Sequence, residues 1–284
     1  SWETMEIVAP AEPGPRGLAG AAFLDTETTG LGGGTGTWVF LVGIAYFEGD
    51  EPRVRQYLLD SPAREGAMLQ ALAEFLRRFE AIVTYNGTTF DLPLLETRYI
   101  TARMRPPVSS LPHLDLLTAA RRLYRGRLPS CRLQELEREL FGLFRNEDEI
   151  PGFEVPSRYF HYLRTGRLEP LRDVITHNSQ DVISLMSIAA YIARLVQEGP
   201  ENGRDALGLA RVHERAKRHG DAAYRERDAG PLRAAQPFLG QELHAQRRED
   251  GRGVQEHHAV RSRGVAQRLA HQDELQREHQ PQQH

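Results

Sequence analysis

The sequence predicts an α/β fold in which a mixed sheet is flanked by helices. Between residues 20 and 198, short apolar runs alternate with longer patterns whose apolar residues recur at helical spacing. The early strands are joined by hairpin signals and the later ones are separated by helices, an order that combines antiparallel with parallel pairing. After residue 199 the composition becomes polar. We therefore expect one α/β domain over residues 20–198, followed by a region of different character.

Local patterns define the individual elements. Residues 1–19 are rich in Pro and Gly, which predicts an irregular N-terminal arm. Gly49-Asp50 is a hairpin signal between the second and third strands, and residues 113–117 open a further segment. Strands are predicted at 21–24, 38–47, 54–59 and 81–84, and helices at 63–79, 92–103, 131–144 and 171–197.

The first acidic motif, Asp25-Thr26-Glu27, follows the apolar part of the first strand. Because side chains alternate across a strand, Asp25 and Glu27 project from the same face. Two adjacent carboxylates repel each other unless a cation neutralises them or one of them stays protonated. A divalent metal ion is the simplest solution, and an ordinary strand end that meets solvent is the alternative.

The second motif lies at a strand-to-helix junction and contains Asn86 and Asp91. A carboxylate at this junction could bind a metal ion, but Asp also caps helices by accepting hydrogen bonds from their free N–H groups. Asn-Gly is a strong turn dipeptide, so Asn86 could serve the turn alone. Both interpretations stay open for each residue.

The third motif lies on the predicted helix over 171–197, where His177 and Asp181 are four residues apart and share one face. An isolated His/Asp pair at this spacing is commonly an ion pair on a helix surface. Here, however, a strand, a strand-to-helix turn and a helix each supply acidic residues in the order that a metal site needs. This combination favours a catalytic role.

The three motifs resemble those of the DEDD exonucleases of the ribonuclease-H-like superfamily, over about residues 20–198. Further residues are similar to the YprB-like branch of bacterial ribonuclease-H-like domain proteins: the Gly-rich run 32–37 leading into 39–45, Pro151-Gly152, Tyr159, His177-Asn178 and Ser184-Leu185. One spacing differs. Exonucleases that use a histidine usually place it five residues before the last aspartate, whereas His177 precedes Asp181 by four.

The resemblance implies a ribonuclease-H-like fold that hydrolyses phosphodiester bonds with two Mg²⁺ or Mn²⁺ ions. Hard cations prefer oxygen ligands, in agreement with a set of carboxylates. The implied ligands are Asp25, Glu27, Asp91 and Asp181. His177 is the candidate general base, and Glu27 is a second catalytic candidate because it can orient the attacking water. The backbone of Thr26 and the side chain of Asn86 are candidates for holding the terminal nucleotide.

These inferences lead to a metal-dependent 3′-to-5′ exonuclease that acts on single-stranded DNA or RNA ends. One alternative is a structure-specific endonuclease on the same fold, because a fold does not determine the reaction. Another is a non-catalytic module that binds nucleic acid or protein. The presence of all four acidic residues argues against the latter, since a binding module could lose any of them without cost.

Composition sets outer limits. The net charge of −3 and the pI near 6.4 do not favour tight non-specific binding of nucleic acid. An Arg-rich stretch over 121–132 could follow a phosphate backbone or form a solvated helix face. The single cysteine, Cys131, excludes an internal disulfide framework and suits a reducing cytoplasm. No apolar run approaches 18 residues, so we expect no membrane span.

The C-terminal region divides into two parts. Residues 199–223 carry apolar residues at helical spacing and look like the start of a tetratricopeptide-like helical repeat, a module that could bind a protein partner. Residues 224–284 form a low-complexity tail rich in Arg, Gln, His and Glu, while Lys217 is the only lysine among 36 basic residues. The preference for Arg over Lys suggests a GC-rich gene. One hypothesis is that the tail is an out-of-frame translation of such a gene, and the alternative is a genuine disordered polar segment. An uninterrupted reading frame at codons 220–225 of the source locus would exclude the first interpretation.

Overall fold

A five-stranded mixed sheet forms the centre of the computed structural model, which describes residues 2–9, 17–30, 34–145, 150–200 and 203–218. The strand order is β3-β2-β1-β4-β5. The strands are β1 (Ala21–Thr28), β2 (Val39–Glu48), β3 (Glu51–Leu58), β4 (Ala81–Thr84) and β5 (His113–Asp115). β1, β2 and β3 pair antiparallel, whereas β4 pairs parallel with both β1 and β5. The predicted mixed sheet is therefore confirmed, as is the hairpin at Gly49-Asp50.

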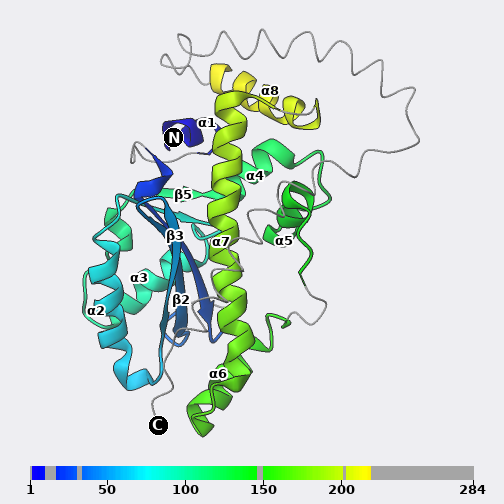
Figure 1. Cartoon of the computed structure of the whole chain (residues 1–284). Helices are drawn as coiled ribbons and strands as arrows, with labels where there is room; N and C mark the ends of the chain where they lie inside the picture. The colour runs from blue at the N-terminus through cyan, green and yellow to red at the C-terminus, as the bar shows by residue number, and fades with distance from the viewer. Residues whose placement is uncertain (1, 10–16, 31–33, 146–149, 201–202, 219–284) are drawn as a thin grey trace.

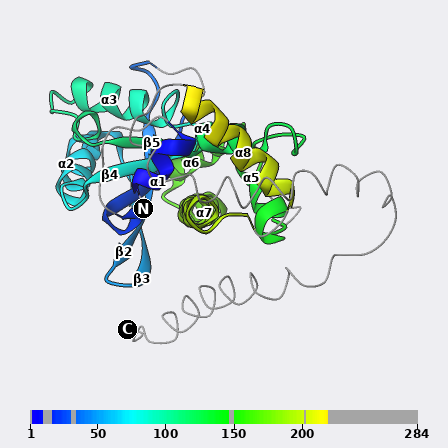
Figure 2. The ribbon, with the colours of Figure 1, turned by 90° about the horizontal axis from the view of Figure 1, so that it is seen from above.

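Helices cover both faces of this sheet. Figures 1 and 2 show α2 and α3 on one side and the long helix α7 on the other. The helices are α1 (Trp2–Val8), α2 (Glu65–Leu76), α3 (Asp91–Thr101), α4 (Leu116–Tyr124), α5 (Leu133–Leu136), α6 (Val155–Thr165), α7 (Glu169–Glu198) and α8 (Gly203–Arg218). Short 3₁₀ turns, η1 (Leu18–Gly20), η2 (Pro62–Arg64) and η3 (Val108–Ser110), precede β1, α2 and β5. A π-helical turn, η4 (Glu137–Phe141), follows α5.

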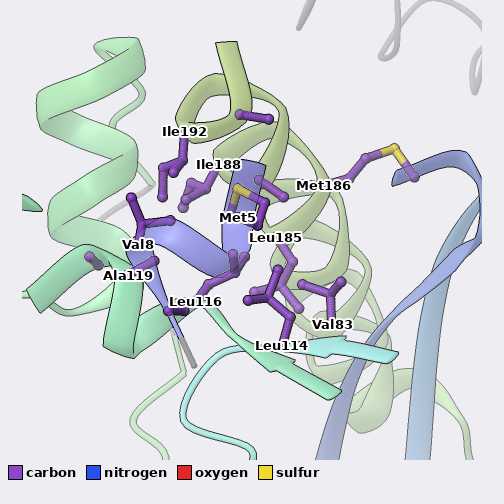
Figure 3. Packing of buried hydrophobic residues seen from close by; sticks show 14 of the residues in the cluster. Met5, Val8, Val83, Leu114, Leu116, Ala119, Leu185, Met186, Ile188 and Ile192 are labelled. Atoms are coloured by element: carbon purple, nitrogen blue, oxygen red, sulfur yellow. The ribbon is translucent and has the colours of Figure 1, made fainter. Parts of the chain in front are cut away.

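The alternation of side chains along β1 explains why two cores form. Ala22 and Leu24 face α2 and α3, whereas Ala21 and Phe23 face α7. On the α7 side, Val83 and Leu114 from the sheet pack near Leu185 of α7, as Figure 3 shows. Each fully buried Leu, Ile or Val contributes about 1.5–3 kcal/mol relative to an exposed one. This packing fixes α7 against the sheet, and Asp25 and Glu27 continue the β1 face that α7 covers.

The prediction of an irregular N-terminal arm over 1–19 is wrong for its first part. Residues 2–8 form α1, and Trp2, Met5 and Val8 are fully buried against α4, α7 and α8. These three residues recur at helical spacing, but the signal spans only two turns and is followed by a Pro- and Gly-rich stretch. Tertiary burial therefore stabilises a helix whose local sequence gives little indication of it. Residues 10–16 lie outside the described part of the chain.

Three other elements differ from expectation or qualify it. The helix predicted over 131–144 is only the short α5, continued by the π-helical η4 and ended by Gly142 in the left-handed region at φ 64°. Helix α7 is the one described helix that passes a length and composition test for crossing a membrane, yet its apolar stripe packs on the sheet as a core helix does. A helix, α8, lies within the segment 199–223 where a repeat is predicted, and the repeat itself stays a prediction. Residues 219–284, which include the predicted tail 224–284, lie outside the described residues.

Candidate active site

Two carboxylates lie near the end of β1, where one edge of this strand is no longer paired with another strand. β1 pairs with β4 only from Ala21 to Phe23, because β4 ends at Thr84. On its other side β1 stays paired with β2 as far as Thr28. Asp25 and Glu27 therefore lie on a strand that is held firmly on one side and open on the other. The turn after β4 and the start of α3 occupy the open side.

Asp91 reaches β1 from the first residue of α3. The hydroxyl of Thr26 donates to Asp91 Oδ1 at 2.6 Å. Asp91 is only 7% exposed. The N-cap position of α3 belongs to Phe90, so Asp91 does not have the capping role that the sequence left open. Its hydrogen bond with the Thr26 hydroxyl directs it toward the first motif.

Helix α7 brings the third motif to the same place. His177 Nε2 lies 3.5 Å from Asp181 Oδ2, as expected for residues one helical turn apart. Asn178, on the same turn, is fully buried and donates from Nδ2 to Asp25 Oδ2 at 2.8 Å. The three predicted motifs therefore meet at β1, although they are separated by up to 156 residues of sequence.

Arg145 was missed by sequence reasoning and lies within this cluster. Its guanidinium donates to Asp181 Oδ1 at 2.5 Å and to both carboxylate oxygens of Glu137 at 2.5 and 2.6 Å. Nη1 lies 3.3 Å from His177 Nδ1. Because a guanidinium only donates hydrogen bonds, Nδ1 is the accepting nitrogen in this contact. Arg145 thus holds together the third motif and the buried Glu137 of η4.

Burial disfavours the ionisation of all four acidic side chains, and repulsion within the set adds to this for Asp25 and Glu27. Burial, and then repulsion from the other three acidic side chains, raises the pKa of Asp25 well above its ordinary value. Burial, with the charges of Asp181 and Asp91, raises the pKa of Glu27 to about 8. Burial also raises the pKa of Asp91, to about 6, although hydrogen bonds from Thr26 oppose this. Burial raises the pKa of Asp181 as well, against the lowering effects of His177 and Arg145. Such a set of carboxylates calls for a compensating cation.

The donor set fits a divalent cation by its chemistry. All four members are carboxylates, the ligands that Mg²⁺ and Mn²⁺ prefer. Within the described residues, no three of His, Cys, Asp or Glu converge in a ready-made ligand geometry. Protein donors hold the carboxylates instead: Asn178 binds Asp25, Thr26 binds Asp91, and Arg145 binds Asp181. Binding of an ion would therefore require these side chains to move toward it and Arg145 to share Asp181.

Two small pockets flank His177. One, of about 260 Å³, has Glu27 and His177 in its wall together with apolar side chains such as Val155 and Val174. The other, of about 220 Å³, is bounded by Arg132, Arg145 and Asp181 as well as His177. Both candidates for proton transfer, Glu27 and His177, thus border one cavity, and two arginines border the next. This is an arrangement suited to an anionic substrate backbone beside a proton acceptor.

The two residues predicted to hold a nucleotide are used differently. Thr26 is occupied with Asp91, as described above. Asn86 has a left-handed backbone at φ 64°, its N–H donates to Asp115 Oδ1 at 2.8 Å, and its Oδ1 accepts from Thr89 at 2.9 Å. The turn interpretation therefore accounts for Asn86, and nucleotide binding by either residue stays a prediction. Asp115 performs the capping that the sequence had suggested for Asp91, because it accepts from Leu117 N–H at the start of α4.

The stability of the metal-free protein should depend on Glu27. Its pKa is about 8 in the folded state, against an ordinary value of 4.5. Between these values the unfolded chain has released a proton that the folded protein retains, so raising the pH destabilises the folded state. We expect the free energy of unfolding in EDTA to fall between pH 5 and 8, by up to a few kcal/mol at about 1.4 kcal/mol per pKa unit.

Urea unfolding at three pH values across that range measures this effect. Glu27→Gln should flatten the dependence because the substituted side chain does not ionise. Equal slopes in the wild type and in Glu27→Gln would show that Glu27 titrates in the folded state as it does in the unfolded one.

Comparisons with known proteins identify a family and individual proteins to which this chain is similar. A family model described as the RNase_H superfamily matches residues 22–193, a range that includes all four acidic residues. Over 195 residues the chain is 37% identical to the uncharacterized protein YprB of Bacillus subtilis (strain 168), which covers 66% of this chain and 46% of YprB. The chain thus spans less than half the length of that relative. The family B DNA polymerase of the hyperthermophilic archaeon Pyrobaculum calidifontis is similar over 70% of this chain and 29% of its own, at 15% identity and a TM-score of 0.45.

Proposed function

The chain belongs to the RNase_H superfamily, as its motifs predict, and on that premise we propose that it is a 3′-to-5′ exonuclease acting on single-stranded DNA or RNA ends. Membership of this superfamily indicates a metal-dependent nuclease. The direction of cleavage and the preference for an end rest on the resemblance of the three motifs to those of DEDD exonucleases. Nucleic acid is accordingly the proposed substrate.

One observation carries the proposal: four carboxylates from β1, α3 and α7 converge at the open side of β1, where the charges of Asp91 and Asp181 help to raise the pKa of both Asp25 and Glu27. A purely structural role would not explain this arrangement, because clustered carboxylates that stay unneutralised cost folding free energy. Active sites are the common place for such clusters. The placement beyond the end of β4, at the carboxyl edge of parallel strands, is also where α/β proteins bind their ligands.

Each site residue then has a chemical task. The proposed ligands of two Mg²⁺ or Mn²⁺ ions are Asp25, Glu27, Asp91 and Asp181. When bound, the ions would neutralise the charge that develops on the attacking and leaving oxygens of an in-line displacement. His177 is the proposed proton acceptor for the attacking water, and Glu27 orients that water from the wall of the same pocket. Thr26 orients Asp91 through the hydrogen bond from its hydroxyl.

The pocket dimensions support a single-stranded end as substrate. A cavity of about 260 Å³ beside Glu27 and His177 is small and partly apolar. An unpaired terminal nucleotide can enter such a cavity at a cost of a few kcal/mol or less, because it has few stacking partners to lose. We also expect that residues 199–223 belong to a helical repeat, that this repeat binds a protein partner, and that the protein is cytoplasmic.

The decisive experiment uses 5′-labelled single-stranded DNA and RNA of the same sequence. With Mn²⁺ or Mg²⁺ we expect a ladder that shortens by one nucleotide at a time, no products in EDTA, and none with Asp181→Ala. Products of one internal length on a branched or hairpin substrate would favour the structure-specific endonuclease instead. Binding of either strand without cleavage under any metal condition would favour the non-catalytic module.

A further inference from the structure

Asp25 belongs to a row of residues that crosses three strands. Asp25 of β1 is paired with Gly43 of β2, and Gly43 is paired with Gln56 of β3. Side chains in such a row point to the same face of the sheet, and neighbouring strands are about 4.8 Å apart. Asp25 and Gln56 are therefore too far apart to bond directly across the glycine. The space between them, on the face covered by α7, is filled by Asn178.

Asn178 requires the glycine beneath it. A Cβ on Gly43 would lie 2.2 Å from Asn178 Oδ1 and 2.9 Å from its side-chain carbon Cγ, distances that real Cβ atoms do not adopt. The absence of a side chain at position 43 thus provides the volume in which the Asn178 amide lies. Asn178 is completely buried there.

The direction of each hydrogen bond in this row is determined by its neighbours. The backbone carbonyl of Ile175 can only accept, and Gln56 Nε2 lies 2.8 Å from it. Gln56 Nε2 also donates to Asn178 at 2.9 Å, so the atom of Asn178 that faces it must be the oxygen. Nδ2 of Asn178 is then directed at Asp25, where it lies 2.8 Å from Oδ2 and 3.3 Å from the backbone oxygen. The main chain of α7 therefore dictates that Asp25 receives an N–H group.

We propose that Asn178, oriented by Gln56 and seated over Gly43, is a positioning residue that fixes the carboxylate of Asp25 for divalent-metal binding. The inference rests on the proposed function, because it concerns a proposed metal ligand. Hydrogen-bond partners that orient a metal ligand typically affect metal affinity by 10- to 100-fold when they are removed. Asn178 is well suited to this task, since it connects Asp25 at once to α7 and to β3.

The test measures Mn²⁺ binding by electron paramagnetic resonance in parallel with urea unfolding. Asn178→Ala should lower Mn²⁺ affinity about 10- to 100-fold. Gly43→Ala should do the same, because the added methyl group displaces the amide of Asn178. Gly66→Ala, an exposed substitution with nothing within 4 Å of the added Cβ, is the matched control and should bind Mn²⁺ as the wild type does.

The double variant Gly43→Ala/Asn178→Ala separates positioning from packing. The methyl group of residue 43 would occupy space that the missing amide leaves, so the double variant should regain stability relative to either single variant. Its Mn²⁺ affinity should stay low, because no N–H group is restored to Asp25. Recovery of both stability and affinity would show that Asn178 only fills space and would overturn the inference.

Gln56→Ala tests the same row at a half-buried position where folding is less at risk, with the exposed Gln70→Ala as its control. Mn²⁺ affinity equal in these two variants contradicts the role of Gln56 in orienting Asn178. A wild-type protein that binds no Mn²⁺ overturns the proposed function together with the inference. Wild-type binding that Asp25→Asn abolishes but Asn178→Ala leaves unchanged overturns the inference alone.

Discussion

Asp25→Asn is expected to abolish metal-dependent cleavage, lowering the rate by about 10³-fold or more, the scale seen when one member of a catalytic unit is lost. The substitution preserves the shape of the side chain and removes one carboxylate charge from the site. The Asp25 carboxylate is repelled by all three other acidic side chains. Asp25 also lies on β1, where pairing with β2 holds its backbone in place. Its removal should therefore eliminate metal binding more completely than a change at the helix positions.

The same substitution should not weaken the fold. Repulsion among the four carboxylates destabilises the metal-free protein, so Asp25→Asn should leave the free energy of unfolding in EDTA unchanged or raise it. Asp173→Asn is the matched control, because Asp173 is an exposed residue of α7 that pairs with Arg158. Cleavage by Asp25→Asn at more than about a tenth of the wild-type rate would contradict the assignment, as would equal losses in the two variants.

His177→Gln is expected to slow cleavage by about 10²- to 10⁴-fold, the usual effect of losing a general base. In the structure one ring nitrogen of His177 faces Arg145 and the other faces Asp181. Proton transfer therefore requires one of these contacts to give way when substrate enters the adjoining pocket. Measuring the cleavage rates of both proteins at saturating Mn²⁺ checks this expectation, because it separates loss of the base from loss of metal binding.

His161→Gln, a partly buried histidine on α6, is the control for this substitution. A normal rate in His177→Gln transfers the proton-accepting role to Glu27. Glu27→Gln should then show the larger loss, because Glu27 borders the same pocket.

The fold and the convergence of the four acidic residues could be predicted because their signals are local. β1, β4 and α7 are encoded by apolar runs of the right period, and Asp25, Asp91 and Asp181 follow from their positions relative to these elements. The mixed sheet and the superfamily are both confirmed. Such elements can be predicted from the sequence because their local pattern agrees with the packing of the whole fold.

Arg145 and the orienting role of Asn178 could not be predicted in the same way. Arg145 lies beyond the end of η4, in a segment without periodicity, and its partners Glu137 and Asp181 are 8 and 36 residues away. Gln56 and Asn178 are 122 residues apart, and only the sheet register shows that Gly43 lies between Gln56 and Asp25. Arg132, from the predicted Arg-rich stretch, borders the same pocket as Arg145, but its local sequence pattern does not indicate Arg145 or Asn178.

The short length of β4 determines which groups can lie beside the end of β1. Had β4 continued alongside β1, its backbone would have taken up the hydrogen-bonding groups of β1 beyond Phe23. Instead Asp91 lies beside this part of β1, where its carboxylate accepts a hydrogen bond from the Thr26 hydroxyl. The early end of β4 thus leaves room beside β1, and the first residue of α3 places an acidic side chain in that room.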